Sequence, residues 1–147
     1  MENNKFIVNV EGCIVSRNKI LMIMRGDTES HAPGTLAFPG GQVEAKDSDV
    51  ETLEDALRRE IYEEVGLKIK NNFEYLESKK FVTRNGNKVL DIVMFCEVDS
   101  ATDFKIDNDE VKECMWMDVD MILSDPRAPQ WIKQSVGMAR KIIKSLF

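Results

Sequence analysis

The stretch "ETLEDALRREIYEEVGL", residues 51–67, is the segment that most strongly predicts the fold. Its apolar residues recur at helical spacing, and Thr52 can cap the helix with Asp55 three residues later as its partner. Gly66 suits the position that follows the last helical residue, because glycine adopts the left-handed conformation without strain. We therefore predict a helix from Thr52 to Val65.

Three glutamates stand within little more than one turn of this helix: Glu60, Glu63 and Glu64. A projection at about 100° per residue places the following residues on the apolar face: Leu53, Ala56, Leu57 and Ile61. Glu60 and Glu64 lie in that same arc and Glu63 lies at its edge. The opposite, solvent side holds three other residues: Asp55, Arg58 and Tyr62. The three glutamates are therefore predicted to point toward the body of the protein.

Burying ionised carboxylates costs several kcal/mol each unless they are paired. Arg59 can reach Glu63 at the i+4 position, but one arginine cannot neutralise three acids. A bound divalent cation would do so, and clustered carboxylates suit Mg²⁺ or Mn²⁺. The alternative is a salt-bridged helix in which Glu63 and Glu64 are partly exposed at its C-terminal end.

The whole chain is typical of one globular domain. It has 147 residues, of which 43% are hydrophobic and 31% charged, and a net charge of −6. The acidic charge and the absence of a Lys/Arg run argue against nucleic-acid binding. We find no signal peptide and no apolar run long enough for a membrane span, so we expect a cytoplasmic protein without a membrane partner. Three separated cysteines, Cys13, Cys96 and Cys114, predict buried free thiols rather than a zinc site.

Alternating and β-branched residues predict strands at 6–15, 19–25, 73–84, 88–98 and 111–119, with a short extended segment at 36–44. Asn85-Gly86 indicates a hairpin turn. A C-terminal helix is predicted from an apolar stripe of Trp131, Ile132, Val136, Ala139, Ile142 and Ile143, with Ser135 on the same side. Core packing is the simplest role for this stripe, with ligand binding by Trp131 as the less favoured alternative. This pattern favours a mixed sheet with helices on its faces.

The segment "PGGQVE" at 39–44, followed by residues 51–67, resembles the Nudix box, the signature of the Nudix hydrolases. The family pattern is G, five residues, E, seven residues, then R-E-U-x-E-E-x-G-U, where U is a bulky aliphatic residue. From Glu51 onward the match is complete. Between Gly41 and Glu51, however, stand nine residues instead of five. The resemblance implies a Nudix-type α/β/α sandwich around a mixed β-sheet, with residues 1–147 as a single Nudix hydrolase domain.

The insertion leaves two points open. Either Asp47 or Glu51 could take the part of the first glutamate of the box, and an alternative helix start at Ser48, paired with Glu51, also fits a capping box. A longer loop costs little entropy, so the helix itself should be undisturbed.

The resemblance also implies roles for individual residues. Glu60, Glu63 and Glu64 would hold one or more Mg²⁺ or Mn²⁺ ions, and the family pattern assigns the backbone carbonyl of Gly41 to the same metal. Arg59 would orient Glu63, its alternative role being a surface pair. Gly40 and Gly41 would let the backbone approach the metal and the substrate phosphates.

Two residues outside the box, Glu110 and Arg25, are further candidates. Glu110 would supply an additional carboxylate, as metal ligand or general base, unless it is an ordinary solvated loop acid. Arg25, at a strand end, could clamp a substrate phosphate or be a surface charge. We expect His31 to lie on the surface rather than to act in catalysis.

Nudix enzymes hydrolyse a nucleoside diphosphate linked to another moiety. We find no proline about fifteen residues after Leu67, as ADP-ribose enzymes tend to have, and no clear motif for CoA or NADH. By elimination, a (d)NTP or modified nucleotide is the predicted substrate. The alternatives are an ADP-ribose or nucleotide-sugar pyrophosphatase and a non-catalytic nucleotide-sensing domain, and the sequence leaves a homodimer open.

Overall fold

A computed structural model describes residues 5–26, 32–70, 72–98, 105–106 and 111–146. The strands are β1 (Ile7–Ser16), β2 (Lys19–Arg25), β3 (Leu36–Ala37), β4 (Gly40–Gln42), β5 (Ala45–Lys46), β6 (Asp49–Val50), β7 (Glu74–Val82), β8 (Lys88–Glu97) and β9 (Val111–Asp118). The helices are α1 (Leu53–Val65), α2 (Val119–Ser124) and α3 (Gln130–Leu146). Within the described part of the chain, no helix is long and apolar enough to cross a membrane.

The large sheet is mixed, as predicted, and is built around β1. β1 and β8 run parallel, whereas β2, β4 and β7 are antiparallel to their neighbours. β8 occupies one edge of β1 over nearly its full length. On the other edge, β4 pairs with Asn9–Glu11 and β2 with Val15–Ser16, so these two strands diverge from the middle of β1.

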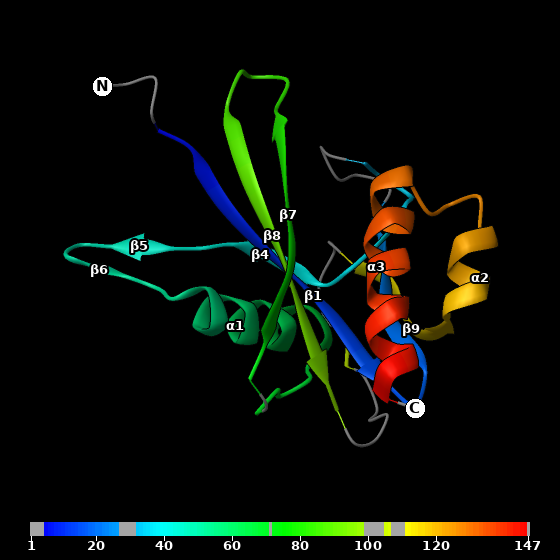
Figure 1. Ribbon diagram of the computed structural model, residues 1–147. Coiled ribbons are helices and arrows are strands. Elements are labelled where there is room, and N and C mark those ends of the chain that lie inside the picture. The colour runs from blue at the N-terminus through cyan, green and yellow to red at the C-terminus, as the bar shows by residue number, and fades with distance from the viewer. Residues whose placement is uncertain (1–4, 27–31, 71, 99–104, 107–110, 147) are drawn as a thin grey trace.

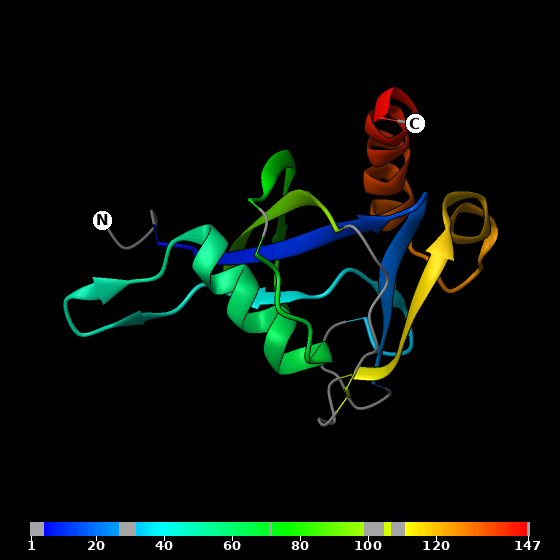
Figure 2. The ribbon, with the colours of Figure 1, turned by 90° about the horizontal axis from the view of Figure 1, so that it is seen from below.

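Helices cover both faces of this sheet (Figure 1, Figure 2). On one face, α1 packs Ala56, Leu57 and Ile61 against residues such as Val10 and Ile14 of β1. On the other face, α3 packs Ile132, Val136, Ala139 and Ile143 against a second cluster that includes Cys13 and Val15. Neighbours in β1 thus alternate between the two cores, because successive strand residues point to opposite faces. The α/β/α sandwich is confirmed.

Helix α1 begins and ends where its sequence predicts. Thr52 is the N-cap, and its side chain accepts a hydrogen bond from the backbone N–H of Asp55 at 3.1 Å. Gly66 is the C-cap with φ of 72°, and its N–H bonds to the carbonyl of Tyr62. The alternative start at Ser48 is not used, since residues 49–50 form β6.

The insertion in the box forms a β-hairpin that the sequence did not reveal. β5 and β6 pair with each other and project from the body of the molecule (Figure 1). Asp47 lies in the connecting turn with φ of 57°. The hairpin closes where the backbone N–H of Glu51 bonds to the carbonyl of Glu44 at 3.0 Å, so the chain returns to the start of α1.

Helix α2 was also not predicted, since six residues are too few for a clear helical period. The three cysteines are free thiols, and burial raises the pKa of each, that of Cys96 to about 11. Cys13 and Cys96 are buried and Cys114 is half-buried, which is close to the prediction.

Candidate functional site

Two adjacent glycines of β4 bring the backbone close to the end of α1. A Cβ atom on Gly41 would lie 2.3 Å from the carboxylate carbon of Glu60, so only glycine allows this side chain to lie against the strand. A Cβ atom on Gly40 would lie 2.2 Å from the carbonyl oxygen of Val10. The backbone N–H of Gly40 donates a hydrogen bond to the carboxylate of Glu64 at 2.7 Å. Gly40 and Gly41 therefore permit the close approach expected from the sequence.

The three glutamates of the box differ in their exposure. Glu64 is buried, with 7% of its surface exposed. The side chain of Glu60 is 15% exposed, whereas that of Glu63 is 56% exposed. The prediction that all three point inward is therefore right for Glu60 and Glu64 and wrong for Glu63, whose place at the border of the apolar arc leaves it at the rim.

Arg59 is the centre of an ion-pair network. Its guanidinium makes two parallel hydrogen bonds to Glu51, both of 2.9 Å, and further bonds to Glu60 at 2.9 Å and Glu63 at 3.3 Å. It also donates to the backbone carbonyl of Gln42 at 3.1 Å. The predicted pair with Glu63 is present, but the strongest partner is Glu51, a two-pronged arrangement that the planar guanidinium favours.

The same contacts shift the pKa of the Glu51 carboxyl group. Hydrogen bonds from Arg59, and then from the backbone N–H of Glu44, lower the pKa of Glu51 to about 2. In turn, the hydrogen bonds that Arg59 donates to Glu51, and then to Glu60, raise the pKa of Arg59. Of the two candidates for the first glutamate of the box, Glu51 contacts this network, whereas Asp47 lies in the turn of the β5–β6 hairpin.

Arg59, the three glutamates of the box and the Gly40-Gly41 backbone line a cleft of about 500 Å³, which we call the acidic cleft. In the described part of the chain its lining residues include five glutamates, Glu11, Glu44, Glu60, Glu63 and Glu64, and two arginines, Arg25 and Arg59. Carboxylate excess of this kind suits a hard divalent cation.

The described residues offer the oxygen ligands that Mg²⁺ or Mn²⁺ requires, but they do not gather them at one point. Among them, no three acidic, histidine or cysteine side chains converge closely enough to hold a metal ion. The carboxylates of Glu60 and Glu63 instead turn to Arg59, and that of Glu64 turns to Gly40. The residue types fit a metal, and the side chains would have to turn toward it.

Arg25 lies at the end of β2 and lines the acidic cleft. Its backbone N–H bonds to the carbonyl of Thr35 at 2.9 Å, and its carbonyl accepts from Gly34 at 3.1 Å, which fixes the strand end beside the cleft. Glu110 and His31 lie outside the described residues, so their predicted roles stay predictions.

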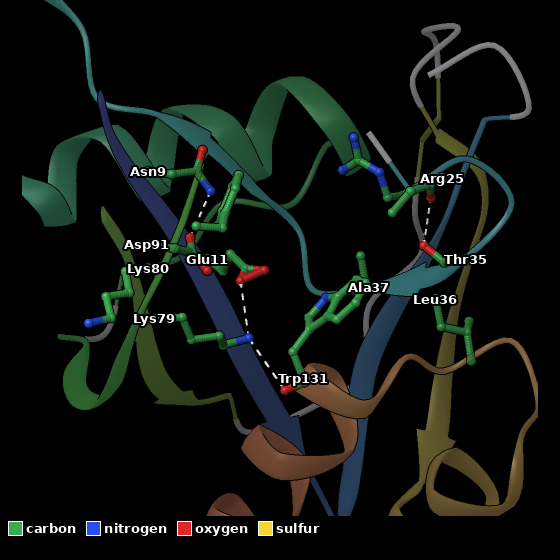
Figure 3. Close-up of a pocket in the computed structure, with 12 residues that line it drawn as sticks. Asn9, Glu11, Arg25, Thr35, Leu36, Ala37, Lys79, Lys80, Asp91 and Trp131 are labelled. Atoms are coloured by element: carbon green, nitrogen blue, oxygen red, sulfur yellow. Dashed lines mark hydrogen bonds and ion pairs between the residues drawn. The ribbon is translucent and has the colours of Figure 1, made fainter. Parts of the chain in front are cut away.

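A second cavity, of about 230 Å³, lies beside the acidic cleft and shares four lining residues with it: Asn9, Glu11, Arg25 and Ala37 (Figure 3). Its polar side holds Asp91, which accepts a hydrogen bond from the side chain of Asn9 at 2.7 Å. Lys79 lies 3.8 Å from the Glu11 carboxylate and bonds to the carbonyl of Trp131 at 3.5 Å. Burial, and then the adjoining Asp91, raise the pKa of Glu11.

Trp131 lines this cavity and is 45% exposed, so its predicted place in the core is wrong. The other members of the stripe are buried or half-buried as expected. Trp131 is in the first turn of α3, at the N-terminal end of the helix, where it lines the cavity instead of packing into the core. The sequence does carry a signal for the cavity, since Asn9, Glu11 and Asp91 interrupt otherwise apolar strands.

The NUDIX domain family model matches residues 7–136. Among solved structures, the MutT protein from Methanosarcina mazei Go1 superposes with a TM-score of 0.78 at 22% identity, covering 93% of this chain and 95% of that one. A MutT NUDIX hydrolase from Burkholderia pseudomallei gives 0.74 at 23% identity, with 92% and 98% covered. The NUDIX domain of Shewanella oneidensis NrtR, complexed with ADP ribose, gives 0.75 at 17% identity, with 95% and 90% covered.

Comparison of the sequence with curated proteins gives no match. The family model, however, covers most of the chain, including β4, the hairpin insertion and the whole of α1. Together with the box at residues 51–67 and the α/β/α sandwich, this match places the chain in the Nudix family of pyrophosphohydrolases.

Proposed function

We propose that this protein hydrolyses a phosphoanhydride bond of a (d)NTP or modified nucleotide with the help of Mg²⁺ or Mn²⁺. One observation carries this proposal: the acidic cleft places five glutamates around two arginines beside the Gly40-Gly41 backbone. Such a cleft is poor at binding a nucleotide phosphate alone, because the acids repel it, and becomes suitable once a divalent cation lies between them.

We assign the metal ligands to the three glutamates of the box, Glu60, Glu63 and Glu64, with the backbone carbonyl of Gly41 as a further ligand. When bound, the metal would neutralise the diphosphate charge and lower the pKa of a water so that it can attack phosphorus. Glu64 is held in place by its bond to Gly40, and Glu60 by its packing on Gly41.

Arg59 serves as a positioning residue in this proposal. Its guanidinium contacts Glu60 and Glu63 and is itself anchored by Glu51. Because Arg59 contacts both carboxylates, it would keep them beside each other at the cleft while they turn toward the cation. Arg25, which also lines the acidic cleft, would clamp a substrate phosphate. For Glu110 we retain the role of metal ligand or general base.

The test is phosphate release from a panel of nucleoside di- and triphosphates, ADP-ribose, dinucleoside polyphosphates and CoA, with Mg²⁺, with Mn²⁺ and with EDTA. We expect cleavage of at least one nucleoside triphosphate, dependent on the metal. Purified, folded protein that cleaves no member of the panel with either ion would contradict the proposal.

A substitution at Glu63 tests the ligand assignment. Because its side chain is 56% exposed, Glu63→Gln should fold normally and yet lower kcat at least about 100-fold, on the scale of losing one electrostatic group from an active site. Glu54→Gln is the matched control, since Glu54 is an exposed residue of the first turn of α1. Full activity of the Glu63 variant would remove this residue from the site.

A second candidate substrate is favoured by one of the structural relatives, the NUDIX domain of NrtR, which was solved with ADP ribose. An ADP-ribose or nucleotide-sugar pyrophosphatase would prefer ADP-ribose in the same panel. A non-catalytic nucleotide sensor would bind members of the panel and cleave none. We further propose that residues 1–147 form a single Nudix domain and that the protein acts in the cytoplasm. Sedimentation would test whether it forms a homodimer.

A further inference from the structure

The second cavity exists because α3 covers only part of its face of the sheet. Toward the Trp131 end, the α3-facing residues change from apolar to polar along each strand. In β1 they pass from Val15 and Cys13 to Glu11 and Asn9, and in β8 from Phe95 and Val93 to Asp91. The register puts the polar residues side by side, because Asn9 pairs with Asp91 in β8, and Asp91 pairs with Lys79 in β7. Beyond the end of the helix, these polar side chains line the cavity instead of an apolar core, and Asp91 at its base is 4% exposed.

The other wall of the cavity is apolar and includes an exposed aromatic ring. It is formed by Trp131, Phe81, Leu36 and Ala37. Figure 3 shows the Trp131 ring between the Glu11–Lys79 pair and Ala37, standing at the side of the cavity. A half-exposed tryptophan beside an apolar wall is a surface on which a flat ring can stack.

The polar end determines which part of a nucleotide the cavity can take. Asp91 and Glu11 both line this end of the cavity, and Lys79 lies 3.8 Å from the Glu11 carboxylate. A phosphate placed there would meet carboxylate oxygens. The phosphates must therefore lie toward Arg25 and the acidic cleft, which leaves the base for the second cavity.

We propose that the second cavity binds the nucleobase of the substrate and that Asp91, with Glu11, selects bases that carry an exocyclic amino group. This inference rests on the proposed function. Trp131 stacks on the base, and the carboxylates accept hydrogen bonds from its amino group. Guanine, adenine and cytosine offer such N–H donors, and carboxylates are known partners of the cytosine amino group. Uracil and thymine present a carbonyl oxygen at the equivalent position, which would face the carboxylate oxygens.

Steady-state hydrolysis tests this selectivity. We expect kcat/KM for GTP, ATP and CTP to exceed that for UTP at least about 10-fold, within the range for one base-reading contact. Asp91→Asn exchanges one acceptor oxygen for an NH₂ donor, so the ratio of CTP to UTP should fall at least about 10-fold. An unchanged ratio in a folded Asp91→Asn protein, or equal use of UTP by the wild type, would overturn the selectivity.

Binding of nucleoside monophosphates in EDTA separates the cavity from catalysis. GMP should quench the fluorescence of Trp131, and Trp131→Phe should lose that signal while its hydrolysis keeps the same base preference. Trp131→Ala should raise KM about 10-fold or more with little change in kcat. Tyr75→Ala is the matched control, since Tyr75 is 63% exposed and lies outside the cavity lining.

The two sets of measurements distinguish the inference from the proposed function. If nucleotides are hydrolysed but Trp131→Ala leaves KM unchanged, the base lies elsewhere and only the inference fails. If no nucleotide is cleaved but GMP and CMP bind at least 10-fold more tightly than UMP, the subsite stands and the proposed hydrolysis fails. Absence of both cleavage and selective binding would overturn both.

Discussion

The acidic cleft and the second cavity lie side by side but are built in different ways. The residues that hold the cleft together belong to one stretch of chain, from Gly40 to Glu64, in which β4, the hairpin insertion and α1 follow one another. The cavity takes its lining from β1, β2, β3, β7, β8 and α3. In the cleft, Arg59 hydrogen-bonds to three carboxylates, whereas in the cavity the contacts join residues of different elements: Asn9 of β1 with Asp91 of β8, and Lys79 of β7 with Glu11 of β1 and Trp131 of α3.

This difference has a physical consequence. The cleft network shares the guanidinium of Arg59 and depends on the close backbone contacts of Gly40 and Gly41. Removing any of these disturbs the other members. A cavity lined by separate strands depends on the sheet register, which many backbone hydrogen bonds maintain. We therefore expect substitutions of Gly40 or Arg59, which hold the network together, to affect stability and catalysis together, whereas Glu63 at the exposed rim should affect catalysis alone. Substitutions near the cavity should affect binding and leave the cleft intact.

The largest effect is expected for Gly40→Ala. Its Cβ would lie 2.2 Å from the carbonyl oxygen of Val10, so β4 must move away from β1. We expect the free energy of unfolding to fall by about 3 kcal/mol or more, as in severe overpacking. Gly137→Ala in α3 is the control, because nothing lies within 4 Å of the added Cβ, and it should gain about 0.5–1 kcal/mol. Equal urea midpoints for the two variants would show that β4 tolerates the displacement.

Arg59→Lys should have the next largest effect. Lysine keeps the charge but cannot make the two parallel bonds to Glu51 while it also reaches Glu60. We expect kcat to fall about 100-fold and the free energy of unfolding to fall by about 2 kcal/mol. GMP binding in EDTA should be unchanged. Loss of GMP binding would mean that the cleft and the cavity are coupled, contrary to the comparison.

The substitution Ser135→Ala tests how α3 supports the second cavity, and its effect should be smaller again. Ser135 is fully buried and its hydroxyl donates to the buried carboxylate of Glu77 in β7, which ties the first turns of α3 to the sheet. Removing this bond should cost about 1.5 kcal/mol and weaken GMP binding by displacing Trp131. Calorimetric titration with Mn²⁺ should give the wild-type affinity. If Ser135→Ala changed the Mn²⁺ affinity and left GMP binding intact, Ser135 would support the acidic cleft and not the second cavity, contrary to the comparison.

The smallest effect is expected in the pH dependence of the stability contributed by Glu51. Because the folded protein lowers the pKa of Glu51 to about 2 from an ordinary value of 4.5, ionised Glu51 stabilises the fold. That contribution is complete above about pH 4.5 and is lost as the pH falls toward 2. Urea midpoints of the wild type and Glu51→Gln should therefore differ at pH 7 and approach each other near pH 2.5. A constant difference at both pH values would contradict the ion pair with Arg59.

Much of the fold could be predicted from local patterns. The bounds of α1 follow from Thr52 and Gly66, and β2 occupies the predicted residues 19–25. The residues of the box also follow, since helical spacing alone brings Arg59 and Glu63 together. The β5–β6 hairpin and α2 were missed, because two-residue strands and a six-residue helix are too short to show a period.

What the sequence by itself determined is the set of contacts between residues close along the chain: the caps of α1, the helical grouping of its acids and the Nudix box. Helical spacing and capping need no partner from elsewhere in the chain. Only the tertiary structure decided that Glu51 is the main partner of Arg59, that Glu63 is exposed, and that Trp131 lies at a cavity beside Asp91. These depend on strand register and on where a helix ends over a sheet, which bring together residues far apart in sequence.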